Sequence, residues 1–161
     1  MILLARLIRL LSRPRWIATG LPRGHAVLLR ASRGRVNRSW AFAFGQRVTP
    51  ITTIGRRTGK PRTTVVAYFH EADKIITTAA NLGNERDPDW ALNLEANPEA
   101  TIILGGRHRR VRARRARGVE RERLWARWEE LQPPAKGVAA IAGREIPVFV
   151  LEPLETGDRR R

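Results

Sequence analysis

Residues 49–80 read TPITTIGRRTGKPRTTVVAYFHEADKIITTAA, and this stretch decides the fold. Runs rich in β-branched and aromatic residues predict strands. These strands are expected at residues 50–54, 62–70 and 74–80. The two connections are short: a basic turn bounded by glycine and proline at 55–61, and Glu71-Ala72-Asp73. Successive strands joined by short turns predict an antiparallel meander.

The chain after this stretch continues in short elements. Asp87 is expected to cap a short helix that begins at Pro88 and ends before Pro98. Gly105-Gly106 predicts a tight hairpin between strands at 101–104 and 107–115, and a second helix and a last strand are expected at 120–131 and 146–151. These elements predict a small antiparallel domain of the α+β class. A closed or half-open barrel would remove its exposed strand edges.

We expect three regions along the 161 residues. A basic extension of helix and loops occupies 1–47, the β domain occupies 48–153, and a frayed basic tail occupies 154–161. Residues 1–16 have the pattern of a basic amphipathic helix, which would either lie on anionic lipid or pack on the domain. No apolar run reaches the roughly 18 residues that a membrane-spanning helix needs.

Charge is the unusual feature of the composition. The net charge is +16, and the first 70 residues hold 14 basic residues and no acidic one. This imbalance indicates an anionic partner such as nucleic acid, a membrane surface or an acidic small ligand, with compositional drift as the alternative. The chain has no cysteine, so disulfides and thiolate chemistry are excluded. We expect a cytoplasmic protein, with the inner face of the cell membrane as a further candidate location.

Two groups of residues are candidate binding sites. The basic turn carries Arg56, Arg57, Lys60 and Arg62, whose side chains suit phosphate and carboxylate groups; the alternative is a solvated hairpin tip. The second group is the polar loop and helix start that hold Asn81, Asp87, Trp90 and Asn93. Trp90 could equally belong to the core.

Other chemistry has little support in the sequence. Seven arginines lie between Arg107 and Arg117, but few aromatic residues accompany them, so a nucleic-acid binder is the lesser candidate. The three histidines show no metal-pair spacing, and neither a catalytic triad nor a paired carboxylate site is evident. We therefore expect no metal site and assign no catalytic side chain.

Four blocks of sequence, in order, resemble one family. The string TTIGRRTGKPR at 52–62 is similar to the basic turn of the deazaflavin (F420)-dependent nitroreductase and quinone reductase family. Further matching blocks are TAANLG at 78–83, DPDWALNLEANPE at 87–99 and REIPV at 144–148. The resemblance covers residues 48–153 and implies a split β-barrel of the FMN-binding, flavin-reductase-like type.

The resemblance also implies a cofactor and a reaction. The cofactor is coenzyme F420 in its reduced form F420H2, with FMN as the alternative, and the reaction is hydride transfer to a quinone-like or nitro-type acceptor. A non-catalytic module that binds a flavin, a lipid or another ligand is the alternative function, and a homodimer is a further expectation. The implied cofactor-binding residues are Arg56, Arg57, Thr58, Arg62, Thr63, Thr64, Val65, Thr78, Ala79, Ala80, Asn81, Asp89, Trp90, Ala91, Leu92 and Asn93.

The sequence departs from some family members in the segment before the last strand. Residues 135–142 read AKGVAAIA and lack the tyrosines that line the acceptor pocket in those members. Ala67 also stands where some relatives have an aromatic residue, and Asn81 where some have lysine. We therefore expect an open acceptor pocket without a tyrosine proton donor, which argues against nitroimidazoles as acceptors.

Overall fold

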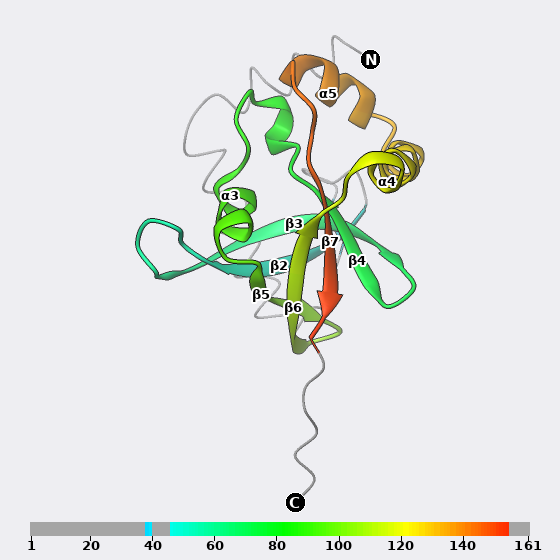
Figure 1. The fold of residues 1–161 in the computed structure, drawn as a ribbon. Helices are drawn as coiled ribbons and strands as arrows, with labels where there is room; N and C mark the ends of the chain where they lie inside the picture. The colour runs from blue at the N-terminus through cyan, green and yellow to red at the C-terminus, as the bar shows by residue number, and fades with distance from the viewer. Residues whose placement is uncertain (1–37, 40–45, 155–161) are drawn as a thin grey trace, which may run out of the picture.

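The computed structural model describes residues 38–39 and 46–154, and its strands form one antiparallel sheet (Figure 1). The strands are β1 (Arg38–Ser39), β2 (Gln46–Ile54), β3 (Pro61–Glu71), β4 (Lys74–Thr78), β5 (Glu99–Leu104), β6 (Arg107–Arg115) and β7 (Val148–Pro153). The helices are η1 (Asn81–Gly83), α3 (Asp89–Ala96), α4 (Gly118–Leu131) and α5 (Ala135–Ala142). The expected helix at 1–16, most of the extension 1–47 and nearly all of the tail lie outside the described residues.

The sheet closes on itself because β2 has two partners. The strand order is β1-β2-β3-β4-β7-β6-β5, and β2 also pairs with β5 from Ile51↔Ile102 to Thr53↔Ala100. Strands β2 to β7 therefore form an antiparallel barrel, which confirms the predicted class. The pairing of strands in the barrel is incomplete. The strand β3 pairs with β2 over Pro61–Tyr68, but it pairs with β4 only at its far end, Phe69–Glu71.

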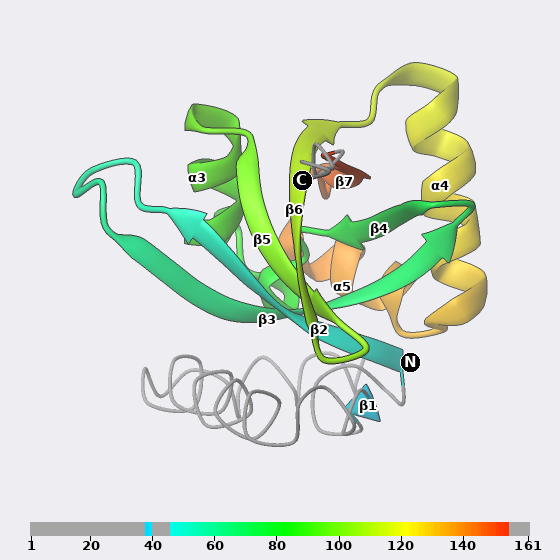
Figure 2. The same cartoon turned by 90° about the horizontal axis from the view of Figure 1, so that it is seen from below.

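The alternation of side chains along the strands builds two apolar clusters. One fills the barrel and contains Ile51, Val66, Tyr68, Ile75, Ile102, Phe149 and Leu151, with Ala91 and Leu94 of α3 packed into it. The other lies between Leu124 of α4 and the outward residues Ile76, Val148 and Val150. Thus α4 covers the outer face of β4 and β7, and α3 lies on the opposite side of the barrel (Figure 2).

Several predicted boundaries were wrong. Asp87 is not the cap of α3: Pro88 holds the N-cap position in an extended conformation, and the Asp87 carboxylate pairs with Arg144 instead. The last strand begins at Val148 and runs to Pro153, and β2 extends back to Gln46. The helix α5 was not predicted, because it is only eight residues long and contains a glycine, Gly137; it ends at Gly143, whose φ is +62°.

Candidate cofactor site

The basic turn is a rigid loop at the tip of the β2–β3 hairpin. The Gly55 N–H donates to the Lys60 carbonyl at 2.9 Å, and Gly59 has a φ of +63° that favours glycine. A Cβ atom at Gly55 would lie 3.0 Å from Thr58 Oγ1, so both glycines are required by the turn geometry. Figure 2 shows the turn projecting beyond the barrel beside α3.

Asn93 ties this turn to α3. Its Oδ1 accepts hydrogen bonds from the Arg56 backbone N–H at 3.1 Å and from the Arg56 guanidinium at 3.2 Å. Its Nδ2 donates to Thr53 Oγ1 at 3.1 Å, and the side chain is only 3% exposed. The helix start and the basic turn, more than thirty residues apart in sequence, are therefore fixed to each other.

The cations of the turn are not equivalent. Arg56 is 24% exposed and already pairs with Asp89 at 2.9 Å, so much of its hydrogen-bonding capacity is used within the protein. Arg57, Lys60 and Arg62 have no ion-pair partner among the described residues. The free positive charge at this end of the barrel therefore comes from these three side chains. Lys60 was absent from the residues implied by the family, although it stands in the predicted basic turn.

A gap in the sheet lies next to the turn. Among the strands described, the β3 residues Arg62–Val65 pair with β2 and not with β4, and Thr63 contacts Thr52 through their hydroxyl groups at 2.8 Å. Across the gap, the Thr78 Oγ1 is buried and has no hydrogen-bond partner within the part of the chain that the structure describes. An unpaired buried hydroxyl is costly, so its position where β3 and β4 separate fits a polar ligand.

Arg144 holds the loop that follows β4. Its guanidinium donates to the carbonyls of Ala79 at 2.9 Å and Asn84 at 3.1 Å, and it pairs with the Asp87 carboxylate. The loop needs this support because Asn81 and Leu82 both have positive φ values, 47° and 53°. Arg144 stands in the REIPV block at 144–148 that resembles the family, but the sequence predicted no role for it.

The predicted site residues fall into three groups by exposure. Exposed residues, which can meet a ligand directly, are Arg57, Thr58, Arg62 and Asp89; Arg56 is exposed as a residue, but its side chain is only 24% exposed. Half-buried ones are Thr63, Thr64, Ala80, Asn81, Trp90 and Leu92. Buried ones are Val65, Thr78, Ala79, Ala91 and Asn93; apart from the Thr78 hydroxyl described above, they can act mainly by shaping the surface.

Two of the half-buried residues, Trp90 and Asn81, already contact other parts of the protein. Trp90 packs against Phe149 with ring centroids 5.5 Å apart, so it belongs partly to the barrel core. The Asn81 amide donates to the Arg86 carbonyl at 2.8 Å. Asn81 therefore helps to shape its own loop, whatever contact it makes with a ligand.

Several arginines of β6 pair with acidic side chains. Arg114 bonds to Glu120 and Glu152, and Arg110 pairs with Glu99 at 2.8 Å. The hydrogen bond from Arg114 lowers the pKa of Glu120. Ion pairs of this kind reduce the free positive charge that this strand offers to nucleic acid. Among the described residues, no cluster of histidine and carboxylate side chains could hold a metal.

An antiparallel split barrel with a cationic turn beside an unzipped strand edge defines a protein of the flavin- and deazaflavin-binding class. A sequence profile of the F420H2-dependent quinone reductases matches residues 21–153. The chain belongs to this family. It is accordingly an F420H2-dependent oxidoreductase with coenzyme F420 as its cofactor and a quinone-like acceptor.

Known proteins agree with this assignment. A Mycobacterium tuberculosis (H37Rv) protein described as an F420H2-dependent quinone reductase is 30% identical over 85% of this chain and 93% of its own length. The solved structure of an F420H2-dependent reductase, FDR-A, is 31% identical, covers 65% of this chain and 93% of its own, and has a TM-score of 0.60. A structure titled a domain-swapped dimer is 28% identical over 80% of this chain and 99% of its own, with a TM-score of 0.61.

None of the described helices is long and apolar enough to cross a membrane.

Proposed function

We propose that the basic turn and the neighbouring gap in the sheet bind F420H2 and present it to a quinone-like acceptor. The observation that carries this proposal is the set of cations without ion-pair partners among the described residues, Arg57, Lys60 and Arg62, on a turn that Asn93 fixes beside the part of β3 that β4 does not pair with. Charge-assisted hydrogen bonds from these side chains suit the phosphate and carboxylate groups of the cofactor.

Each part of the site has a proposed task. The free cations hold the anionic tail, while Arg56, bound to Asp89 and Asn93, positions the turn. The edge of β3 and the loop after Thr78 border the ring, with the unpartnered Thr78 hydroxyl as a hydrogen-bonding group. The bound deazaflavin supplies a hydride to the acceptor, so the protein contributes binding, orientation and exclusion of water.

The acceptor side of the site carries no aromatic side chain in α5. This helix packs on η1, where the ideal Cβ position of Gly83 lies 3.3 Å from Ile141 Cγ2. Without a tyrosine in residues 135–142, protonation of the reduced acceptor is assigned to solvent. The proposed acceptor is therefore a quinone, and a nitro-type acceptor is the second candidate.

The experiment that tests the function is a fluorescence titration of the protein with F420 and with FMN at low and moderate salt. We expect selective, salt-sensitive F420 binding, and reduction of menadione when F420H2 is supplied. Arg57→Gln should weaken F420 binding about 10- to 100-fold, because one charge-assisted contact is worth roughly 1.5–3 kcal/mol. Arg109→Gln removes an exposed arginine from the barrel wall and is the matched control. Equal losses in both variants, or retention of FMN alone, would contradict the proposal.

A second proposal concerns the membrane and rests on the sequence of residues 1–16. Their basic amphipathic pattern fits a helix that lies on anionic lipid, near a lipid-soluble quinone. Deleting these residues should reduce sedimentation with vesicles of anionic phospholipid while leaving F420 affinity unchanged. Equal sedimentation of the full and shortened chains would make the segment a packing element instead.

A further inference from the structure

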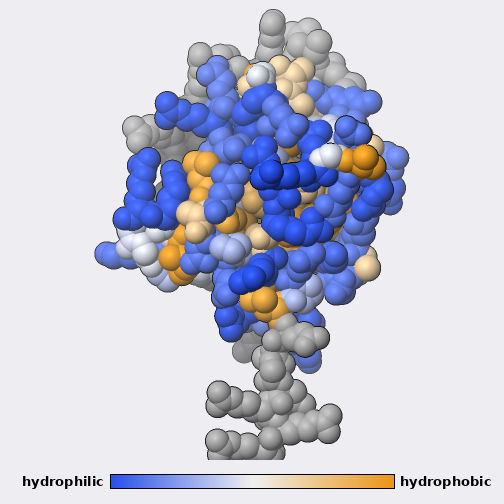
Figure 3. Space-filling view, in the orientation of Figure 1, coloured by the Kyte–Doolittle hydropathy of each residue, from blue (hydrophilic) through white to orange (hydrophobic). Residues whose placement is uncertain are grey.

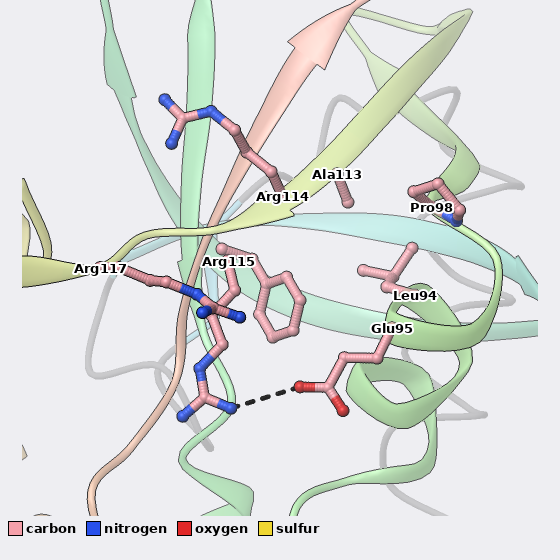
Figure 4. Close-up of a pocket in the computed structure, with 8 residues that line it drawn as sticks. Leu94, Glu95, Pro98, Ala113, Arg114, Arg115 and Arg117 are labelled. Carbon is pink, nitrogen blue, oxygen red and sulfur yellow. Dashed lines mark hydrogen bonds and ion pairs between the residues drawn. The ribbon is translucent and has the colours of Figure 1, made fainter.

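A second pocket opens between the C-terminal half of α3 and the end of β6 (Figure 4). Its volume is about 390 Å³, within the range of small-molecule sites. It is lined by Leu94, Glu95, Pro98, Ala113, Arg114, Arg115, Arg117 and Phe149. It shares no residue with the proposed cofactor site, and the proposed reaction does not use it.

The floor of this pocket is apolar. Leu94, Ala113 and Phe149 are buried members of the cluster that fills the barrel, and Pro98 adds an exposed ring at the edge. On the face drawn in Figure 3, hydrophilic side chains surround a few apolar ones between α3 and β6. Leu94 and Phe149 are only 2% and 1% exposed, so a ligand with an apolar part would meet the edges of these side chains and the ring of Pro98.

The rim carries positive charge that the protein does not fully neutralise. Arg117 has no ion-pair partner among the residues described. Arg115 contacts Glu95 at 3.3 Å and Glu145 at 3.4 Å, longer than the roughly 2.7–2.9 Å of a strong charge-assisted bond. Figure 4 shows Arg115 and Arg117 on the side facing Glu95, whereas Arg114 points away.

We propose that this pocket binds a small amphipathic anion, namely an aromatic carboxylate or sulfonate. Its charged group would lie between Arg115 and Arg117, displacing Glu95 from Arg115. Its ring would cover Leu94 and Phe149. The pairing of two arginines with an apolar floor favours this class over a purely inorganic anion, which would gain nothing from the floor.

The test uses the full chain without F420, so its outcome does not depend on the cofactor proposal. The probe is anilinonaphthalene sulfonate, whose fluorescence rises in an apolar site, with naphthoate as competitor. We expect saturable binding that naphthoate displaces. Arg117→Gln should weaken it about tenfold or more, through the loss of one charged contact. Arg117 is exposed, so this variant should fold normally.

Two controls make the result decisive. Arg109→Gln, on β6 but outside the pocket, should bind the probe as the unaltered protein does, and so should Arg57→Gln in the cofactor turn. Inorganic sulfate at matched ionic strength should compete poorly. Loss of binding in Arg57→Gln but not in Arg117→Gln would move the probe to the cofactor site and overturn the proposal. Competition by sulfate equal to that by naphthoate would also overturn it.

Discussion

Replacing Arg144 with alanine is expected to weaken F420 binding about a hundredfold and to lower the free energy of unfolding by about 3–5 kcal/mol. The guanidinium is only 17% exposed and bonds to the carbonyls of Ala79 and Asn84 while it pairs with Asp87. Its removal leaves the Asp87 carboxylate unpaired in a half-buried position. It also releases the strained conformations at Asn81 and Leu82. Thermal unfolding and F420 titration measure the two effects.

The loop effect can be separated from general loss of stability. Hydrogen exchange should speed up at residues 79–87 in Arg144→Ala while the amides of β2 and β5 stay protected below the melting transition. Arg144→Lys keeps a positive charge beside the Asp87 carboxylate but lacks the planar guanidinium group that reaches both carbonyls. This variant should therefore recover part of the stability and little of the F420 affinity. Full F420 affinity in a folded Arg144→Ala variant would show that the loop conformation does not contribute to the site.

The sequence predicted the hairpins of the barrel because their signals are local. Turn residues such as Gly105-Gly106, together with β-branched runs, specify adjacent antiparallel strands without reference to the rest of the chain. The closing β2–β5 pair and the partial unzipping of β3 from β4 depend on contacts between distant residues, and no local pattern encodes them. The barrel class could therefore be predicted from the sequence, whereas the gap beside the basic turn is evident only from the strand pairing in the structure.

The candidate site shows the same limit. The basic turn is visible in the sequence as a cluster of cations, but the sequence cannot say which cation is already paired. The structure assigns Arg56 to Asp89 and leaves Arg57, Lys60 and Arg62 without partners among the described residues. Asp87 illustrates the converse, since its cap-like position before a proline hid its pairing with Arg144, more than fifty residues away.

Replacing Asn93 with leucine is expected to cost about 2–4 kcal/mol of stability and to weaken F420 binding at least tenfold. Leucine has a similar volume and a good helix propensity, so α3 itself should persist. The substitution removes the hydrogen bond to Thr53, whose hydroxyl is fully buried, and both bonds to Arg56. The basic turn then loses its attachment to α3, and its free cations are no longer fixed beside the gap in the sheet. Urea unfolding and F420 titration are the measurements.

Asn93→Asp and Asn97→Ala are the matched variants for this prediction. An aspartate keeps an acceptor for both Arg56 donors, and the Thr53 hydroxyl can turn to donate to it, so F420 affinity should stay within a few fold of the original. Asn97→Ala removes one hydrogen bond, to the Glu99 N–H, at the other end of α3. It should lower stability slightly and leave F420 affinity unchanged. If Asn97→Ala weakens F420 binding as much as Asn93→Leu does, F420 affinity depends on the integrity of α3 as a whole. The hydrogen bonds from Asn93 to Arg56 would then have no specific role in binding. If Asn93→Leu binds F420 normally, the turn holds its own position and α3 serves only the core.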